Sequence, residues 1–185
     1  MGKKRPETEK IMRHIFLTGA VQTGKSTAIR RFLCANRAYR AGGFITVSRP
    51  SAEPGFLWDV FILPHDYTES DILPARLVGR RSAERGGSRA YPAAFDAEGT
   101  ALLRREGHFD LLLMDELGRM ELGAPLFRAA VLHALDGSIP VLGVIKPEHN
   151  EFLDAVRAHE NVTVLEVTEE NRDAIPARIA ALWEE

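Results

Sequence analysis

The chain alternates short runs of apolar residues with longer stretches in which apolar residues recur every three or four positions. The short runs are typical of strands buried on both faces of a sheet, and the longer stretches are typical of amphipathic helices. We expect strands at residues 12–18, 42–49, 55–63, 109–116, 139–146 and 162–168. We expect helices at residues 25–38, 93–107, 124–137, 148–160 and 169–185. This order predicts an α/β fold in three layers, α/β/α, around a mainly parallel sheet.

Two segments depart from this alternation. Residues 42–49 and 55–63 are β-rich runs joined by a short segment that contains Pro54 and Gly55. Because Pro-Gly favours a turn, we predict an antiparallel hairpin at one edge of the sheet. Residues 73–92 carry glycines, prolines and charge without clean periodicity, and we expect a long, partly irregular excursion there. Long loops in compact domains are often functional.

The ends of two helices carry local signals. Gly137 is expected to end the helix at 124–137. Thr168 suits the N-cap of the last helix, but Pro176 lies inside the expected span 169–185. Because proline lacks the amide hydrogen that a helix interior needs, we expect the first turn of this helix to be separate or kinked.

Composition places the chain among soluble globular proteins. Its 185 residues suffice for one domain, which we assign to residues 12–185, behind a charged, flexible tail at residues 1–11. Apolar residues make up 45% and charged residues 27% of the chain, which is ordinary for a globular protein. No segment approaches the roughly 20 apolar residues of a membrane span, and the first residues lack the apolar segment of a secretory signal.

The cysteine content and the net charge bear on the cellular compartment and on the partners of the protein. Cys34 is the only cysteine, and a chain without a disulfide partner suits a reducing cytoplasm. We expect Cys34 to be a buried structural thiol in the first helix. The formal net charge of −2 does not indicate a nucleic-acid partner, although the segment from Arg76 to Arg89 is rich in arginine. That segment is either a solvated loop, a lid over a ligand or a contact for an acidic partner. We expect a cytoplasmic monomer without a membrane partner.

The stretch GAVQTGKST stands between a predicted strand and a predicted helix. It fits the pattern G-x-x-x-x-G-K-[ST], in which backbone N–H groups and a helix N-terminus surround a phosphate. Lys25 would reach the β- and γ-phosphates, and the hydroxyl of Ser26 would ligate Mg²⁺. The alternative is a glycine turn with a solvated lysine, but the flanking strand and helix favour a phosphate-binding loop. The residues expected to bind the nucleotide here are Gly19, Ala20, Val21, Gln22, Thr23, Gly24, Lys25, Ser26 and Thr27.

Two adjacent carboxylates follow the apolar run of the strand at 109–116. Asp115 is expected at the carboxyl end of a buried strand, where ligands bind in such sheets, and it can hold Mg²⁺ through the water shell of the ion. Glu116 can accept a proton from an attacking water. Adjacent residues of a strand point to opposite faces, so one should face the metal while the other reaches over the γ-phosphate. Without the phosphate-binding loop, a solvated acidic turn would be the better explanation.

The motifs GAVQTGKST, GGFIT, LLLMDELGRMEL, VLGVIK and VTEENRD occur in this order across residues 12–184. With these motifs at this spacing, the sequence resembles the THEP-type nucleoside-triphosphatases, a family that includes the human cancer-related nucleoside-triphosphatase. The resemblance implies a RecA-like P-loop NTPase fold, with an extra strand between the P-loop strand and the acidic strand. It also implies Mg²⁺-dependent hydrolysis of ATP, GTP and other nucleoside triphosphates to diphosphates, with little base selectivity and slow turnover.

The resemblance assigns roles to individual residues. The metal-associated aspartate of the family falls on Asp115, and its presumed base falls on Glu116. Arg119 stands where the family usually has lysine, and either cation would neutralise charge on the γ-phosphate. Lys146 stands where a small polar residue or proline is more usual. Arg172 matches the arginine of the family's ENR motif.

Two interpretations of Arg172 remain open at this stage. A C-terminal arginine close to a phosphate-binding loop stacks on the nucleotide base or completes the active site. Alternatively, Arg172 takes part in a helix-capping network with Thr168 and Glu169.

Other functions would use the same phosphate-binding loop. A nucleotide or small-molecule kinase would bind a second substrate beneath residues 65–92. A nucleotide-dependent switch would bind tightly, turn over very slowly and change the affinity for a partner. A nucleic-acid-associated ATPase would use the arginines of residues 76–89 and show strong salt dependence. The carboxylate of Glu116 beside Asp115 favours hydrolysis, with water as the acceptor.

Overall fold

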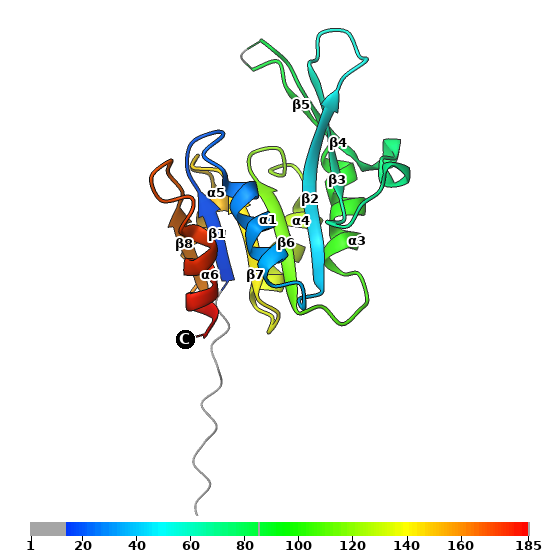
Figure 1. Ribbon diagram of the computed structural model, residues 1–185. Coiled ribbons are helices and arrows are strands. Elements are labelled where there is room, and N and C mark those ends of the chain that lie inside the picture. Colours follow the sequence, from blue (N-terminus) through cyan, green and yellow to red (C-terminus); the bar gives the residue numbers. More distant parts are fainter. Residues whose placement is uncertain (1–13, 85, 185) are drawn as a thin grey trace, which may run out of the picture.

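Within residues 14–84 and 86–184, which the computed structural model describes, eight strands form a single sheet in the order β5-β4-β3-β2-β6-β7-β1-β8 (Figure 1). The strands are β1 (His14–Thr18), β2 (Ala41–Pro50), β3 (Trp58–Leu63), β4 (Leu77–Arg81), β5 (Arg89–Ala90), β6 (Leu111–Leu117), β7 (Val141–Ile145) and β8 (Val162–Glu166). From β2 to β8 the neighbouring strands of the sheet are parallel, whereas β3, β4 and β5 extend it as antiparallel strands. The predicted mainly parallel sheet is confirmed; the predicted tail at residues 1–11 lies outside the described residues.

Helices cover both faces of the sheet, which confirms the three-layer prediction (Figure 1). One face carries α1 (Lys25–Ala35) and α6 (Ile175–Glu184). The other carries α2 (Pro92–Ala94), a π-helical turn (Phe95–Gly99), α3 (Thr100–Leu103), α4 (Pro125–Leu135) and α5 (Glu151–Ala158). Single 3₁₀ turns at Glu69–Asp71 and Pro74–Arg76 lie between β3 and β4. No helix in the described parts of the chain is both long enough and apolar enough to cross a membrane.

Alternate residues of β1 enter two separate hydrophobic cores. Phe16 packs in the core that contains Phe127 of α4 and Phe152 of α5. Ile15 and Leu17 pack in the core under α1 and α6. Because β1 is buried on both faces, its sequence is a continuous apolar run rather than an alternating one.

The antiparallel part of the sheet is larger than the sequence indicates. The predicted hairpin is confirmed, since β2 and β3 pair antiparallel with Ser48 opposite Val60. The segment 73–92 is more regular than predicted, because β4 pairs with β3 and β5 pairs with β4. A strand that is held by backbone hydrogen bonds at a sheet edge does not need apolar side chains throughout. Because this segment contains arginines and glycines, its sequence lacks the apolar pattern that predicts a strand.

Helix boundaries also differ from the predicted ones. The last helix begins at Ile175 rather than at residue 169, and Pro176 lies in its first turn, where no amide hydrogen is needed. Turns occupy the preceding segment, where the Thr168 amide donates to Asn171 Oδ1 (2.9 Å) and the Asn171 amide donates to Thr168 Oγ1 (3.4 Å). The predicted separate first turn is therefore confirmed. It is Asn171 that exchanges these two hydrogen bonds with Thr168.

The prediction that Cys34 is buried is wrong. Cys34 is exposed on α1. The buried face of this helix is formed by Ala28, Ile29 and Phe32. Because Cys34 follows Phe32 by two positions, the turn of an α-helix carries it to the opposite side.

Candidate active site

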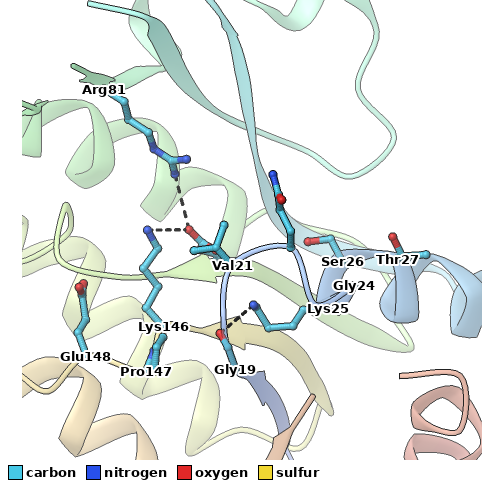
Figure 2. Close-up of a pocket in the computed structure, with 12 residues that line it drawn as sticks. Gly19, Val21, Gly24, Lys25, Ser26, Thr27, Arg81, Lys146, Pro147 and Glu148 are labelled. Atoms are coloured by element: carbon cyan, nitrogen blue, oxygen red, sulfur yellow. Dashed lines mark hydrogen bonds and ion pairs between the residues drawn. The ribbon is translucent and has the colours of Figure 1, made fainter. Parts of the chain in front are cut away.

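The carboxyl ends of β1, β6 and β7 meet at one edge of the sheet, and the segments that follow them surround a pocket of about 520 Å³. The phosphate-binding loop follows β1, Glu116 lies near the end of β6, and Lys146 follows β7. Figure 2 shows Lys146 and Arg81 beside the loop that carries Lys25. The antiparallel part of the sheet contributes Arg81 from the end of β4. The pocket is lined by Gly19, Val21, Gln22, Gly24, Lys25, Ser26, Thr27, Arg81, Glu116, Lys146, Pro147 and Glu148.

The conformation of the phosphate-binding loop depends on its glycines. Gly19 has φ +133°, and a β-carbon there would lie 2.4 Å from the carbonyl oxygen of Val167. Gly24 has φ +98° at the N-cap of α1, a left-handed conformation that glycine adopts without strain. The first turn of α1 has no acidic residue, and its N-cap makes no side-chain hydrogen bond. The free amide groups of this helix N-terminus are therefore available to an anion.

Lys25 places its ammonium group inside the loop. Its Nζ donates to the carbonyl oxygens of Gly19 (2.9 Å) and Ala20 (2.5 Å). Burial lowers the pKa of Lys25, while the nearby carboxylates of Glu116 and Asp115 act in the opposite direction. The loop thus combines a cation with the N-terminus of α1, as a phosphate site requires.

Ser26 lines the pocket, whereas Asp115 is not among its lining residues. The Ser26 hydroxyl acts on the Asp115 carboxyl and favours its ionised form. Burial raises the pKa of Asp115 to about 6, and the adjacent charge of Glu116 acts in the same direction. A hydroxyl and a carboxylate are both oxygen ligands of the kind that Mg²⁺ prefers. A divalent cation beside Asp115 would favour its ionised form, so these two residues fit the metal that the sequence predicts.

Glu116 is held by two cations. Its Oε1 lies 3.1 Å from Lys146 Nζ and 3.6 Å from a guanidinium nitrogen of Arg81. Figure 2 draws both contacts as dashed lines that converge on one oxygen. The sequence identified Glu116 and singled out Lys146, but it did not identify Arg81 as a pocket residue.

Arg119 does not line the main pocket. It is exposed, and it borders a small cavity of about 20 Å³ together with Met120, Glu121 and Glu116. Its role as a catalytic cation stays a prediction. Glu121, which the sequence reasoning missed, is only 3% exposed and accepts a hydrogen bond from the Gly118 amide (3.0 Å). This contact fixes the turn that follows β6.

A second pocket of about 340 Å³ lies on the other side of the phosphate-binding loop. Arg172 borders it, and its Cδ would lie 3.5 Å from a β-carbon placed on Gly24. Arg31 and Asp173 form an ion pair there (2.5 Å). The Arg172 side chain thus lies beside the nucleotide loop, while its amide donates to the Thr168 carbonyl oxygen (3.1 Å). A role of Arg172 in nucleotide binding stays a prediction.

Part of the arginine-rich segment is strand β4 rather than a solvated loop, and residues 82–84 and 86–88 lie outside the strands. A role of the segment as a lid or as a contact for an acidic partner stays a prediction. Arg76 pairs with Glu98 (3.2 Å), and Arg80 pairs with Asp59 (2.9 Å). Arg81 instead faces the main pocket. A count of arginines gives no side-chain directions. Arg76 lies in the turn before β4, and the pairing of β4 with β3 distinguishes Arg80 from Arg81.

The glycine loop between β1 and α1, and the strand β7 inserted between β1 and β6, define a P-loop protein with RecA-like strand order. The predicted extra strand between the loop strand and the acidic strand is confirmed. The chain belongs to the NTPase family, whose pattern it matches over residues 14–180.

Individual relatives support this membership. The chain is 25% identical to nucleoside-triphosphatase THEP1 of Thermotoga maritima over 169 residues, which cover 87% of this chain and 90% of the relative. It is 31% identical over 181 residues to a protein of Bos taurus named cancer-related nucleoside-triphosphatase homolog, with 87% and 91% covered. The solution structure of a human cancer-related nucleoside triphosphatase matches with a TM-score of 0.66 at 25% identity, covering 92% of this chain and 96% of that one. The resemblance drawn from the motifs is confirmed.

Proposed function

We propose that this protein hydrolyses nucleoside triphosphates to nucleoside diphosphates and phosphate with the help of Mg²⁺. The observation that carries the proposal is that Glu116 lines the same pocket as Lys25 and the N-terminus of α1. A carboxylate in that position can act on a water molecule that approaches a phosphate held by the loop. The names of the relatives support the same reaction.

The phosphate-binding loop would hold the β- and γ-phosphates. Its amides from Gln22 to Thr27 and the positive end of the α1 dipole favour phosphate charge. Lys25 Nζ, now on the carbonyls of Gly19 and Ala20, is within the same loop and would donate to phosphate oxygens.

Ser26 and Asp115 would hold Mg²⁺, through the hydroxyl and through the carboxylate or its bound water. When bound, the ion neutralises charge on the phosphate oxygens. The proposal of Mg²⁺ rests on the interaction of the Ser26 hydroxyl with the Asp115 carboxyl and on the chemistry of these oxygen donors.

Glu116 would act as the general base. It accepts a proton from the attacking water as the water oxygen bonds to the γ-phosphorus. The bond from that phosphorus to the bridging oxygen breaks, and the electron pair leaves with the nucleoside diphosphate. Glu116 contacts Lys146 and Arg81 before the nucleotide binds, and the need to break these contacts supports slow turnover.

The nucleoside would lie in the second pocket, beside Arg172. A guanidinium plane stacks on any base without reading its hydrogen-bonding edge. The Arg31–Asp173 pair in the same pocket is well exposed. These features support use of ATP, GTP and other triphosphates with little selectivity among bases.

Phosphate release from ATP, GTP, CTP and UTP tests the proposal, with nucleotide binding measured on the same samples. Glu116→Gln should lower kcat by about 10²- to 10⁴-fold and still bind nucleotide. Lys25→Ala should weaken triphosphate binding, because the loop loses its cation. Glu106→Gln changes an exposed carboxylate that precedes β6, and it should behave like the wild type.

Two outcomes would contradict the proposal. One is tight, Lys25-dependent binding without release of phosphate, which would favour a nucleotide switch. The other is transfer of phosphate to an added acceptor faster than its release to water, which would favour a kinase.

We extend the proposal to the setting of the protein, a cytoplasmic monomer. The single cysteine supports a reducing compartment. The arginines that pair within the chain leave less free positive charge for nucleic acid.

A further inference from the structure

Outside the phosphate-binding loop and α1, the main pocket is lined by Arg81, Glu116, Lys146, Pro147 and Glu148. Arg81 comes from the end of β4, and Lys146 comes from the segment after β7. Both lie against the same oxygen of Glu116, at 3.6 Å and 3.1 Å. All three side chains remain accessible to the pocket, with exposed fractions of 40% for Arg81, 36% for Lys146 and 26% for Glu116.

The backbone of Arg81 is held by β3 and by the residue that precedes this strand. Arg81 stands opposite Trp58 in the β3–β4 ladder, and its carbonyl oxygen accepts from the Leu57 amide (2.8 Å). Two residues earlier, β4 lies so close to the turn after β6 that a β-carbon on Gly79 would lie 1.9 Å from Met120 Cε. The end of β4 that carries Arg81 thus lies near the turn that follows the acidic end of β6.

The guanidinium group of Arg81 has unused donors. Among the described residues, its side-chain ion pair is with Glu116, at 3.6 Å, which is longer than a hydrogen bond. By contrast, the neighbouring Arg80 is held by Asp59 and Glu53 (2.9 Å and 3.4 Å). Arginine donates in a planar fork that matches the oxygens of a phosphate.

A γ-phosphate in the loop would compete with Glu116 for these cations. The phosphate carries more negative charge than one carboxylate and offers three oxygens. When Arg81 and Lys146 turn to it, Glu116 loses both ion pairs, and its oxygen is free to accept a proton from water. The same step places positive charge on the group whose negative charge spreads during transfer.

We propose that Arg81 is a catalytic residue of this enzyme: it contacts the γ-phosphate and exchanges Glu116 for it when a triphosphate binds. The inference rests on the proposed hydrolysis. Arg81 donates N–H groups to non-bridging γ-oxygens while the water oxygen bonds to phosphorus and the bridging P–O bond breaks. The proton of the water goes to Glu116, and the electron pair leaves with the diphosphate.

The test compares Arg81→Ala and Arg81→Met with the wild type, in hydrolysis and in equilibrium binding of ATP and ADP. We expect kcat to fall about 100-fold in both variants, as when a single transition-state donor is removed. ATP affinity should fall about tenfold while ADP affinity stays unchanged, because only ATP carries the γ-phosphate. Arg89→Ala, which removes an exposed arginine of β5, should match the wild type.

A second test of the exchange removes the carboxylate of Glu116. Glu116→Gln should raise ATP affinity about tenfold relative to ADP, because Arg81 and Lys146 no longer leave a carboxylate. In the Arg81→Ala background the gain should be smaller. If Glu116→Gln raises ATP affinity equally in the wild type and in the Arg81→Ala variant, the proposed exchange is wrong.

The outcomes separate this inference from the proposed function. A wild type that binds ATP without hydrolysis defeats the proposed function, and the ATP–ADP comparison still decides whether Arg81 meets the γ-phosphate. If the wild type hydrolyses ATP and kcat of Arg81→Met falls less than about threefold, the loss is far below that expected for a transition-state donor. The inference about Arg81 then fails, while the proposed function stands. A rise in kcat would mean that Arg81 restrains Glu116, which also overturns it. Thermal unfolding shows whether a variant is misfolded. In that case Arg81→Lys, which keeps the positive charge but loses the planar guanidinium group, is tested in place of the misfolded variant.

Discussion

Glu121 is a carboxyl group that the fold buries almost completely behind the acidic end of β6. It accepts a hydrogen bond from the Gly118 amide, yet burial raises its pKa from 4.5 to about 7. The positive charge of Lys146 acts in the opposite direction, and the carboxylate of Glu116 acts in the same direction as burial. The folded protein therefore keeps a proton on Glu121 over a pH range in which the unfolded chain has released it.

The sign of the pH dependence follows from this difference. The contribution of Glu121 to the free energy of unfolding is full below pH 4.5 and is lost as the pH rises through about 7. Glu121→Gln keeps the acceptor for Gly118 and has no proton to lose. We expect the variant to gain about 2–3 kcal/mol over the wild type between pH 5 and pH 8.

Urea denaturation at the two pH values measures this gain. Glu106→Gln, at an exposed carboxylate, is the control and should leave the difference unchanged. A Glu121→Gln variant whose stability differs from that of the wild type by the same amount at pH 5 and pH 8 would contradict the raised pKa.

At the scale of elements, Gly43 fixes how closely β2 approaches β6. It has φ +81°, and a β-carbon there would lie 2.1 Å from the carbonyl oxygen of Leu113 in the paired strand. Backbone atoms of a central strand cannot move away as a flexible side chain can. The GGFIT motif therefore contains a glycine that the sheet requires for both conformation and space.

Gly43→Ala should lower the free energy of unfolding by more than about 2 kcal/mol, because strain at positive φ adds to the clash with β6. Gly55→Ala is the matched control. Gly55 has a similar φ of +86° with nothing within 4 Å of a β-carbon, so it should cost only about 1 kcal/mol. Equal losses in the two variants, measured by urea denaturation, would show that the approach of the strands contributes nothing.

The elements that the sequence predicts well are those whose burial on both sides leaves an apolar run. β1, β6 and β7 are of this kind, and the positions of the phosphate-binding loop and of Asp115 and Glu116 follow from them. The sequence does not predict β4, because backbone hydrogen bonds hold this strand and its residues include a glycine and two arginines, of which Arg80 pairs with Asp59 of β3. Helix α5 begins at Glu151 rather than at residue 148, since the Asn150 side chain caps it by accepting from the Leu153 amide.

The residues of the site also fall into a group that the sequence predicts and a group that it does not. Contiguous residues such as Gly19 to Thr27 form a sequence motif, so the sequence alone predicts that they bind phosphate. Arg81 is far from them in the chain and reaches the pocket only through the pairing of β3 with β4. Glu121 is missed for a similar reason, because its burial depends on how the turn after β6 packs.

At the scale of the whole molecule, one pocket joins the two parts of the sheet. The parallel strands carry the phosphate-binding loop, Glu116 and Lys146, and the antiparallel extension carries Arg81. Its β2–β3 and β4–β5 turns extend beyond the carboxyl edge of the parallel strands (Figure 1). A ligand that contacts Arg81 thereby links the edge strands to the center of the fold.

Amide hydrogen exchange should report this link. A non-hydrolysable triphosphate should slow exchange in β4 and β5 about tenfold, because a contact to Arg81 opposes local opening of these short edge strands. A diphosphate should slow exchange in α1 and leave β4 unchanged. Arg81→Ala should abolish the difference between the two ligands, and slowing of β4 by both ligands alike would contradict the link.

The exposed position of Cys34 has a consequence for experiment. The chain contains no other cysteine, and Cys34 lies on the outer side of the helix that begins in the phosphate-binding loop. A maleimide fluorophore would therefore attach at a single site on the native sequence. Its emission would follow the arrival and departure of nucleotide in real time, in a stopped-flow instrument, without any engineered labelling position.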